Sequence, residues 1–206
     1  MELTVNLFIT LDGVIQGPGG PEEDRSGGFD RGGWLVPFVD DDFGRIVGGW
    51  FEKPQAFLLG RRTYDIMSAY WPSVTDTDDD TPVKLNTLPK YVPSSTLTDP
   101  SWSHTTVLSG LDEVAALKAQ PGGELQVHGS GALAASLLEA GLVDELRLLV
   151  FPVAVGAGKR LFHDVVTAFD LVDSAVTSTG VVYQALRPRP FVSGDHVIVD
   201  GRETLV

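Results

Sequence analysis

Residues 124–138 read ELQVHGSGALAASLL, and the order of residue types in this stretch decides the fold. A short apolar run at 125–127 meets a turn of glycine, serine and glycine at 129–131, and strong helix formers follow. A strand that enters a helix through glycines leaves unpaired backbone N–H groups at the helix start, where the positive end of the helix dipole also lies. The turn is therefore a candidate phosphate cradle, although a tight connection without a ligand has the same glycines.

The composition is that of an acidic globular protein with a single core. The 206 residues are 43% hydrophobic and 21% charged, which is ordinary for a folded domain. The formal net charge is −13, which argues against a nucleic-acid binder, because such proteins carry a basic face. An acidic protein that binds an anion must gather its few cations locally, so clusters of Arg and Lys are informative.

Several kinds of site and partner are excluded by what the sequence lacks. It has no cysteine, and therefore no disulfide, thiolate metal site or cysteine nucleophile. Its four histidines are scattered without ligand spacing, so we expect no metal site. No apolar run is long enough to span a bilayer, and the first residues lack the basic start of a secretory signal. These features predict a cytoplasmic protein that binds neither membrane nor nucleic acid.

Strand-like and helix-like patterns alternate along the chain. Strands are predicted at 3–11, 56–59, 90–95, 105–108, 124–127 and 145–155, with a terminal hairpin at 171–177 and 181–186. Helical patterns fall at 40–52, from 61 onward, at 112–120 and at 132–138. The alternation predicts an α/β fold with three α-β-α layers, in which a mixed, mostly parallel central sheet ends in an antiparallel hairpin. We expect one domain at 1–188 and a C-terminal tail at 189–206, with a second hairpin signal at Asp200 and Gly201.

Polar and basic turns follow four of the predicted strands. They begin at Asp12, Gly60, Ser94 and Gly129. Because ligands of parallel α/β sheets lie beyond the carboxyl ends of the strands, we expect these turns to meet along one edge. The glycine-rich segment 16–33 is long for a loop of a compact domain, which favours a functional role. The acidic run TDTDDDT at 75–81 is expected to be a solvated loop.

Four motifs occur together in an order that resembles a known family. They are LDG at 11–13, GRRTY at 60–64, VHGSG at 127–131 and GAGKRLF at 156–162. The combination is similar to the dihydrofolate-reductase-like superfamily. Within it, the chain most resembles the reductase domain of the bifunctional riboflavin-biosynthesis deaminase–reductase, of RibD C-terminal type, over residues 1–188. The resemblance implies a dihydrofolate-reductase-like fold and an NADPH-dependent oxidoreductase. Such an enzyme transfers hydride to a small heterocyclic or sugar-linked substrate, as 5-amino-6-(5-phosphoribosylamino)uracil reductase does.

The resemblance also implies positions for NADPH along the sheet edge. The nicotinamide would be lined by the backbone at Leu7 and Phe8 and by the side chain of Ile15. The turn of Gly60, Arg61, Arg62 and Thr63 would open a helix at the phosphates, and Ser94 and Ser95 would face the adenosine 2′-phosphate. The pyrophosphate would be held by Gly129, Ser130, Gly131, Ala132 and Leu133. Elementary electrostatics agrees, because two helix starts and two arginines place positive potential where an anionic cofactor needs it. The alternative is that Arg61 and Arg62 are two solvated surface side chains that bind no phosphate.

The substrate would enter between loop 16–33 and the nicotinamide, and its candidate contacts are Asp12, Trp34, Phe38 and Trp50. Dihydrofolate reductases carry an acid on the first helix, and the corresponding position here falls near Gly44. Among the nearest acids, Asp42 and Glu52 are the candidate catalytic proton sources, and a helix cap is the alternative role for Asp42. Because no acid occupies that position of the first helix, two alternatives to a reductase of the riboflavin branch remain open. They are a dihydrofolate reductase and a non-catalytic nucleotide-binding or sensor domain on the same fold.

Other nucleotide-binding folds fit less well. A Rossmann fingerprint requires an acid at the end of the next strand, and 145–155 ends in PVAV. A P-loop would need glycine in place of Val153 and Ser or Thr in place of Arg160. The signature of a zinc deaminase is absent, so we expect a stand-alone reductase domain with a small-molecule substrate. A homodimer is the expected assembly, with tail residues 197–201 pairing to the sheet edge of another subunit.

Overall fold

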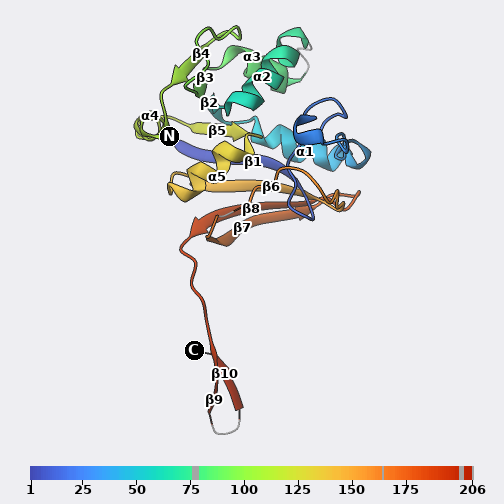
Figure 1. The fold of residues 1–206 in the computed structure, drawn as a ribbon, viewed down its shortest axis with the longest axis vertical. Helices are drawn as coiled ribbons and strands as arrows, with labels where there is room; N and C mark the ends of the chain where they lie inside the picture. The colour runs from blue at the N-terminus through green and yellow to red at the C-terminus, as the bar shows by residue number, and fades with distance from the viewer. Residues whose placement is uncertain (76–78, 164, 200–201, 206) are drawn as a thin grey trace.

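Eight strands form one sheet, with β1 (Glu2–Thr10) in its interior (Figure 1). The computed structural model describes residues 1–75, 79–163, 165–199 and 202–205. The strand order is β4-β3-β2-β5-β1-β6-β8-β7. The other strands of this sheet are β2 (Pro54–Leu58), β3 (Lys90–Pro93), β4 (Thr105–Leu108), β5 (Glu124–His128), β6 (Glu145–Phe151), β7 (Ala168–Val176) and β8 (Val182–Arg189). The first six strands in that order run parallel, and β8 and β7 form an antiparallel hairpin, which confirms the predicted mixed sheet.

Helices cover both faces of the sheet, so the predicted three layers are confirmed. The helices are α1 (Asp41–Trp50), α2 (Arg61–Tyr70), α3 (Asp80–Thr87), α4 (Leu111–Lys118) and α5 (Gly131–Glu139). On one face, Val114 of α4 and Leu137 of α5 are buried in one cluster with Val5 of β1. On the other face, Trp50 of α1 and Tyr64 of α2 share a second cluster with aromatic and aliphatic residues of β2, β3 and β6.

Strand β1 is buried on both faces, as a central parallel strand must be. Its apolar residues Leu3 and Val5 are fully buried, and so is the polar Thr4 between them. Strand β5 pairs with β1 as far as Asn6, which lies opposite His128, whereas β6 accompanies β1 to Thr10. The carboxyl end of β1 therefore extends beyond the end of β5, which opens the sheet edge at this point.

Two details of the sequence-based prediction are wrong. The acidic run was expected to be a loop, but α3 begins at Asp80, and Asp79 accepts a hydrogen bond from the Thr81 N–H at 2.8 Å as its N-cap. The rest of that run, 76–78, lies outside the described residues. Strand β6 ends at Phe151 rather than Val155, because Pro152 has no N–H to continue a ladder.

The chain ends in a separate hairpin of β9 (His196–Val199) and β10 (Arg202–Leu205), which pair antiparallel. Figure 1 shows this hairpin standing well away from the eight-stranded sheet on an extended segment. The turn signal at Asp200 and Gly201 lies outside the described residues. Among the helices that the structure describes, none has the length and apolar character that crossing a membrane requires.

Candidate functional site

The glycine turns after β2 and β5 lie against each other and bring two helix starts together. The Gly60 N–H donates to Ser130 Oγ at 2.9 Å, and Ser130 Oγ donates to the His128 carbonyl at 3.1 Å. The Gly129 N–H donates to the Asn6 carbonyl at 3.2 Å, which fixes the second turn to β1. The N-termini of α2 and α5 are thus neighbours at the carboxyl edge of the sheet, as predicted from the sequence.

Both helix N-termini have first-turn backbone N–H groups that could bind an anion. Their N-cap residues are Gly60 and Ser130, and neither supplies a side-chain cap to its own helix in the described structure. The first-turn amides belong to residues 61–63 and 131–133, which are the predicted positions Arg61, Arg62, Thr63, Gly131, Ala132 and Leu133. A Cβ at Gly131 would collide with Cδ1 of Ile15, so glycine is needed for the loop to approach this closely. Two adjacent helix dipoles with open amides form a site that suits a pyrophosphate group.

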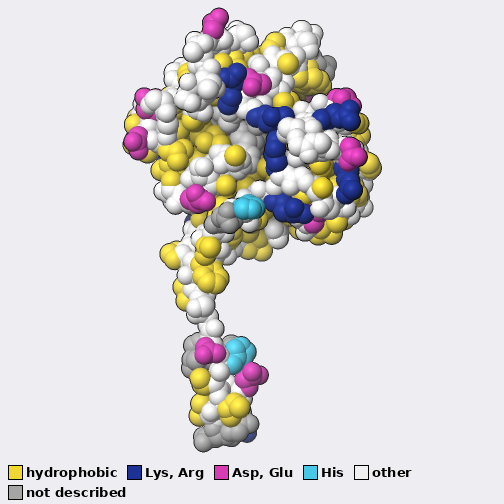
Figure 2. Space-filling model, in the orientation of Figure 1, with side chains coloured by type: hydrophobic (Ala, Val, Ile, Leu, Met, Phe, Trp, Pro, Cys, Tyr) yellow, Lys and Arg dark blue, Asp and Glu magenta, His cyan; other side chains and the backbone are white. Residues whose placement is uncertain are grey.

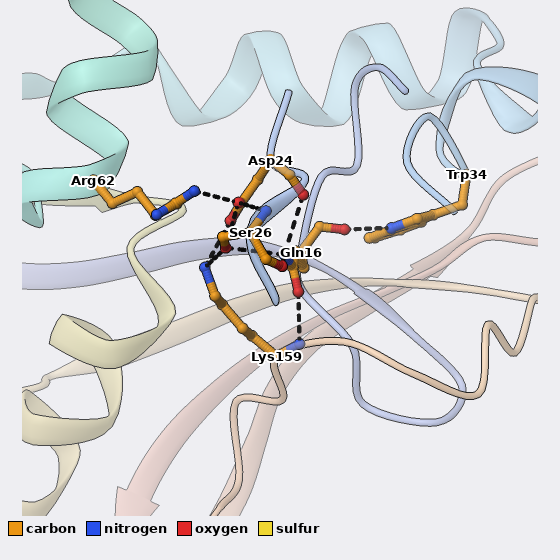
Figure 3. Close-up of polar contacts among 6 residues, drawn as sticks. All are labelled: Gln16, Asp24, Ser26, Trp34, Arg62 and Lys159. Carbon is orange, nitrogen blue, oxygen red and sulfur yellow. Dashed lines mark hydrogen bonds and ion pairs between the residues drawn. The ribbon is translucent and has the colours of Figure 1, made fainter. Parts of the chain in front are cut away.

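A buried carboxylate links the long loop to two cations near these helix starts (Figure 3). Arg62 Nη2 donates to Asp24 Oδ1 at 2.6 Å, and Lys159 Nζ donates to Asp24 Oδ2 at 2.8 Å. The Asp24 side chain is 8% exposed. Burial alone would raise the pKa of Asp24, but hydrogen bonds from Lys159, Ser26 and Arg62 together hold it well below its usual range. The loop is therefore held by a charged carboxylate placed between two cations.

Gln16 ties the same loop to both sides of the site (Figure 3). Its Nε2 donates to the carbonyls of Asp24 at 3.1 Å and Ser26 at 2.9 Å, and its Oε1 accepts from the Lys159 N–H at 3.1 Å. Trp34 Nε1 donates to the Gln16 carbonyl at 2.8 Å. Segment 16–33 is thus fixed through Gln16 to Lys159 on one side and to the ring of Trp34 on the other.

Arg61 lies on the outer side of α2 and reaches the turn after β3. Its Nε donates to Asp65 at 2.9 Å, and its Nη1 donates to Thr96 Oγ1 at 3.3 Å. Ser94 Oγ accepts from the Thr96 N–H at 3.2 Å, and Ser95 beside it is exposed. The structure brings Arg61 and the two serines to one corner, where the resemblance places a 2′-phosphate.

The aromatic residues predicted to contact the substrate, Trp34, Phe38 and Trp50, pack around Phe8 and Phe151, which lie on the adjacent strands β1 and β6. Trp50 stacks on Phe8 with ring centroids 5.6 Å apart, and Trp34 meets Phe151 edge-on at 5.3 Å. Phe38 also contacts the Phe151 ring, at 6.0 Å. Sequence reasoning missed the part that Phe151 plays, and its position at the end of a buried strand is the signal that marks it. The side chain of Leu7 faces the opposite core beneath α5, and the predicted contact of its backbone with the nicotinamide stays a prediction.

The predicted acids have other partners or another location. Asp42 accepts from Arg45 Nη2 at 2.8 Å and from the Ser178 N–H at 3.2 Å, which joins α1 to the β7–β8 turn. Glu52 lines a cavity of about 370 Å³ together with Glu124 and Arg147, at the amino ends of β5 and β6. Glu52 is therefore at the opposite sheet edge from the glycine turns, and a proton-donating role for Asp42 stays a prediction.

Asp12 fastens the loop after β6 to the loop after β1. Its carboxylate accepts hydrogen bonds from Thr10 Oγ1 at 2.6 Å, the Val155 N–H at 3.2 Å and the Gly156 N–H at 2.7 Å. The Thr10 hydroxyl contributes most to lowering the pKa of Asp12 to about 2. These bonds give Asp12 a positioning role, and its predicted contact with a substrate stays a prediction.

His128 packs beside the glycine turn that follows β5. Its ring stacks on Phe51 at 4.8 Å, and Nε2 lies 2.9 Å from Gln126 Oε1. Burial, with a smaller contribution from Arg147, lowers the pKa of His128 to about 3, so the ring is neutral at pH 7. No group of three potential metal ligands gathers anywhere in the described part of the chain.

Solved structures with the same architecture come from several bacteria. A candidate riboflavin biosynthesis protein of Shewanella sp. PV-4 is 22% identical with a TM-score of 0.67, covering 92% of this chain and 99% of the other. A pyrimidine reductase-like protein of Corynebacterium diphtheriae is 14% identical with a TM-score of 0.60, covering 92% of each chain. Dihydrofolate reductase of Enterococcus faecalis, solved with NADP(H) and RAB-propyl, is 14% identical with a TM-score of 0.58, covering 91% of this chain and 96% of the other. These similarities establish the fold.

Sequence comparison establishes the family. The uncharacterised protein YyaP of Bacillus subtilis (strain 168) is 30% identical over 185 residues, which is 87% of this chain and 91% of that protein. The model of the RibD C-terminal domain matches residues 1–183. That match spans the eight-stranded sheet except most of β8, residues 184–189, and with it every turn of the candidate site. The chain belongs to the RibD C-terminal domain family.

Proposed function

We propose that this protein is an NADPH-dependent reductase of a small heterocyclic or sugar-linked substrate. The observation that carries the proposal is the pair of adjacent, uncapped helix starts joined by the hydrogen bond from the Gly60 N–H to Ser130 Oγ. Two helix N-termini with Arg62 and Lys159 nearby provide positive potential in a chain whose net charge is −13. Such a local concentration of positive charge matches a pyrophosphate.

The nucleotide would be held by groups with separate tasks. The open amides of α2 and α5 would bind the pyrophosphate, and Arg61 with the serines after β3 would bind the 2′-phosphate. Ile15, beside Gly131, and the carboxyl end of β1 at Phe8, where β5 no longer pairs with β1, would border the nicotinamide. NADPH, when bound, supplies the hydride, and the protein contributes binding, orientation and exclusion of water.

The aromatic cluster favours a planar substrate. Phe8, Trp34, Phe38 and Trp50 form one continuous group of rings with Phe151. Trp34, Trp50 and Phe151 are buried within this group, whereas Phe8 and Phe38 are partly exposed and would offer ring surface for stacking on a planar heterocycle. A pyrimidine such as 5-amino-6-(5-phosphoribosylamino)uracil satisfies this condition, which agrees with the family and makes it the first substrate to assay.

A second candidate function is a nucleotide-binding sensor without turnover. The observation in its favour is that Asp42 is bonded to Arg45 and to the β7–β8 turn, while Glu52 lies at the other sheet edge. A reductase would consume NADPH in the presence of its substrate, whereas a sensor would bind the nucleotide without consuming it.

The proposal is tested by titrating the purified protein with NADPH and, separately, with NADH. The tryptophan that bonds to Gln16 lies in the site and provides a fluorescence signal. We expect NADPH to bind at least tenfold more tightly than NADH, because in this proposal Arg61 and the serines bind the 2′-phosphate that NADH lacks. Equal affinities for NADPH and NADH would exclude the proposed binding of the 2′-phosphate by Arg61 and the serines. If neither nucleotide binds, the proposed function is overturned.

A further inference from the structure

Strand β7 presents an open edge that carries exposed apolar side chains beside the exposed acids Asp170 and Asp173. It is the last strand in the sheet order, and its partner in the described structure is β8 on one side. Leu171 and Val172 are exposed, and Val176 is 67% exposed. An open edge strand offers unpaired N–H and C=O groups, and apolar side chains on it make pairing with another strand favourable.

The C-terminal arm, defined here as residues 190–205, is the second unpartnered feature. In Figure 1 its hairpin stands away from the rest of the chain, and Figure 2 shows apolar side chains along the stalk and hairpin. Val192 is 75% exposed and Ile198 is 80% exposed. A two-stranded hairpin by itself is marginally stable in water. The arm also lies outside the family match, which ends at residue 183.

We propose that the arm of one copy docks on β7 of a second copy, so that two chains form a symmetric dimer by exchanging arms. Strand β9 is the docking strand, because it carries Val197, Ile198 and Val199 in succession and all three are exposed. Strand β10 carries the polar Arg202 and Glu203 and suits the solvent side. Pairing β9 with β7 extends the sheet across the dimer by strand addition.

A second copy of this chain fits better than the arm's own body. Segment 190–195 is extended, and six residues span about 20 Å, which carries β9 away from the β7 of the same chain. In a twofold-symmetric dimer, the β7 edge of each copy pairs with β9 of the other copy, and each hairpin is covered by the body on which it docks. The exchange is complete with two copies and leaves no unpaired arm or edge to recruit a third.

The surface that this exchange buries is large enough for a stable dimer. The described part of the arm exposes large apolar side chains at 191, 192 and 197–199. If each buries on the order of 100 Å², the two arms and the surfaces that they cover remove about 2,000 Å² from water. Stable protein dimers bury about 1,200–2,000 Å² or more.

Crosslinking tests the contact directly, because the chain has no native cysteine. Two full-length variants, Leu171→Cys and Ile198→Cys, are mixed and treated with a short bis-maleimide. One variant carries a tag, so that mixed dimers have a distinct mass. We expect mixed dimers to be the main product. A double variant that carries both cysteines in one chain is treated in the same way at high dilution. Crosslinking within that single chain would place the arm on its own body and overturn the proposal.

The dimerisation equilibrium supplies an independent test. Sedimentation equilibrium of the full chain is expected to show a dimer, and Ile198→Asp is expected to raise the dimer dissociation constant at least tenfold. Thr204→Asp on β10 is the matched control and is expected to leave it unchanged, because β10 faces solvent in the proposed dimer. A wild-type chain that stays monomeric, or an Ile198→Asp variant that dimerises as tightly as wild type, would refute the exchange.

Discussion

At the scale of single residues, Asp24 is the group that most affects the charge of the site. Its carboxylate lies between Arg62 and Lys159 and is nearly buried. It therefore neutralises part of the positive potential that the two helix starts and cations offer to a phosphate. Sequence reasoning found Arg62 through its glycine turn but did not single out Asp24, because 38 positions separate the two residues and nothing in the local pattern of either marks the pair.

Replacing Asp24 with asparagine is expected to tighten NADPH binding. A negative charge near the phosphates is removed while the shape of the side chain is kept. At separations of roughly 6 Å in a partly hydrated site the gain is about 0.7–1.4 kcal/mol, or about threefold to tenfold in affinity. Isothermal titration calorimetry measures it, and Asp30→Asn, an exposed change of the same kind in the same loop, is the control. Weaker binding by Asp24→Asn would mean that Asp24 orients Arg62 for the cofactor.

Replacing Arg62 with alanine is expected to weaken NADPH binding by about 1–3 kcal/mol, because a charge-assisted hydrogen bond to a phosphate is lost. Arg187→Ala, an exposed arginine on β8 far along the sheet order, is the matched control and should leave the affinity unchanged. The same calorimetric titration reports both variants. An Arg62→Ala protein that binds as tightly as wild type would exclude this guanidinium from the phosphate site.

At the scale of elements, the strand–turn–helix unit of β5 and α5 supports the account most directly. A methyl group at Gly131 would collide with Cδ1 of Ile15, which must then leave its place above the turn. Gly131→Ala is therefore expected to weaken NADPH binding about tenfold. Gly110→Ala, at a helix start with open space around the added methyl, is the control. Circular dichroism establishes that both variants are folded, and unchanged affinity in Gly131→Ala would count against the cradle.

The same strand carries a pH-sensitive contribution to stability. The pKa of His128 is about 3 in the folded state and 6.5 in the unfolded state, so between these values only the unfolded chain binds the proton. Stability is therefore fully present above pH 6.5 and falls as the pH drops below it, by about 1.4 kcal/mol per pH unit. Urea unfolding at pH 7 and pH 5 should differ by roughly 2 kcal/mol from this group. His128→Gln should remove most of that difference, whereas His104→Asn, at an exposed histidine, should retain it.

The elements were predicted well where local pattern determines them. Apolar runs located the strands of the sheet, and glycines marked the start of α2 and α5. Helix α3 was missed because its acidic start looks like a solvated loop until Leu85 is seen to be buried against the sheet. The contacts of Asp42 were equally hidden, because they depend on the β7–β8 turn reaching α1.

At the scale of the whole molecule, the site and the proposed dimer surface are separate. The glycine turns follow β2 and β5, whereas β7 is separated from β1 by β6 and β8 in the sheet order. Ile198→Asp is accordingly expected to change the dimer equilibrium and to leave NADPH affinity within twofold of wild type. Nucleotide titration of this variant at low protein concentration checks the expectation. A parallel loss of affinity would show that the site depends on the second copy.

The order of motifs along the chain identified the superfamily because these turns meet at one edge of the sheet. What the sequence did not reveal is the conformation of segment 16–33, whose fixed points, Gln16 and Asp24, bind residues remote in sequence. The aromatic wall was found in part, since Trp34, Phe38 and Trp50 were named but Phe151 was not. Pairings across the sheet determine these features, and local periodicity does not encode them.

The central claim is that a pyrophosphate lies between the N-termini of α2 and α5. Amide NMR of ¹⁵N-labelled protein titrated with NADPH tests it most directly. We expect the largest chemical-shift changes at the amides of residues 61–63 and 131–133 with either nucleotide, and we expect the Ser94 and Ser95 amides to shift with NADPH but much less with NADH. Changes confined to the opposite edge, around the cavity lined by Glu52 and Arg147, would contradict the account.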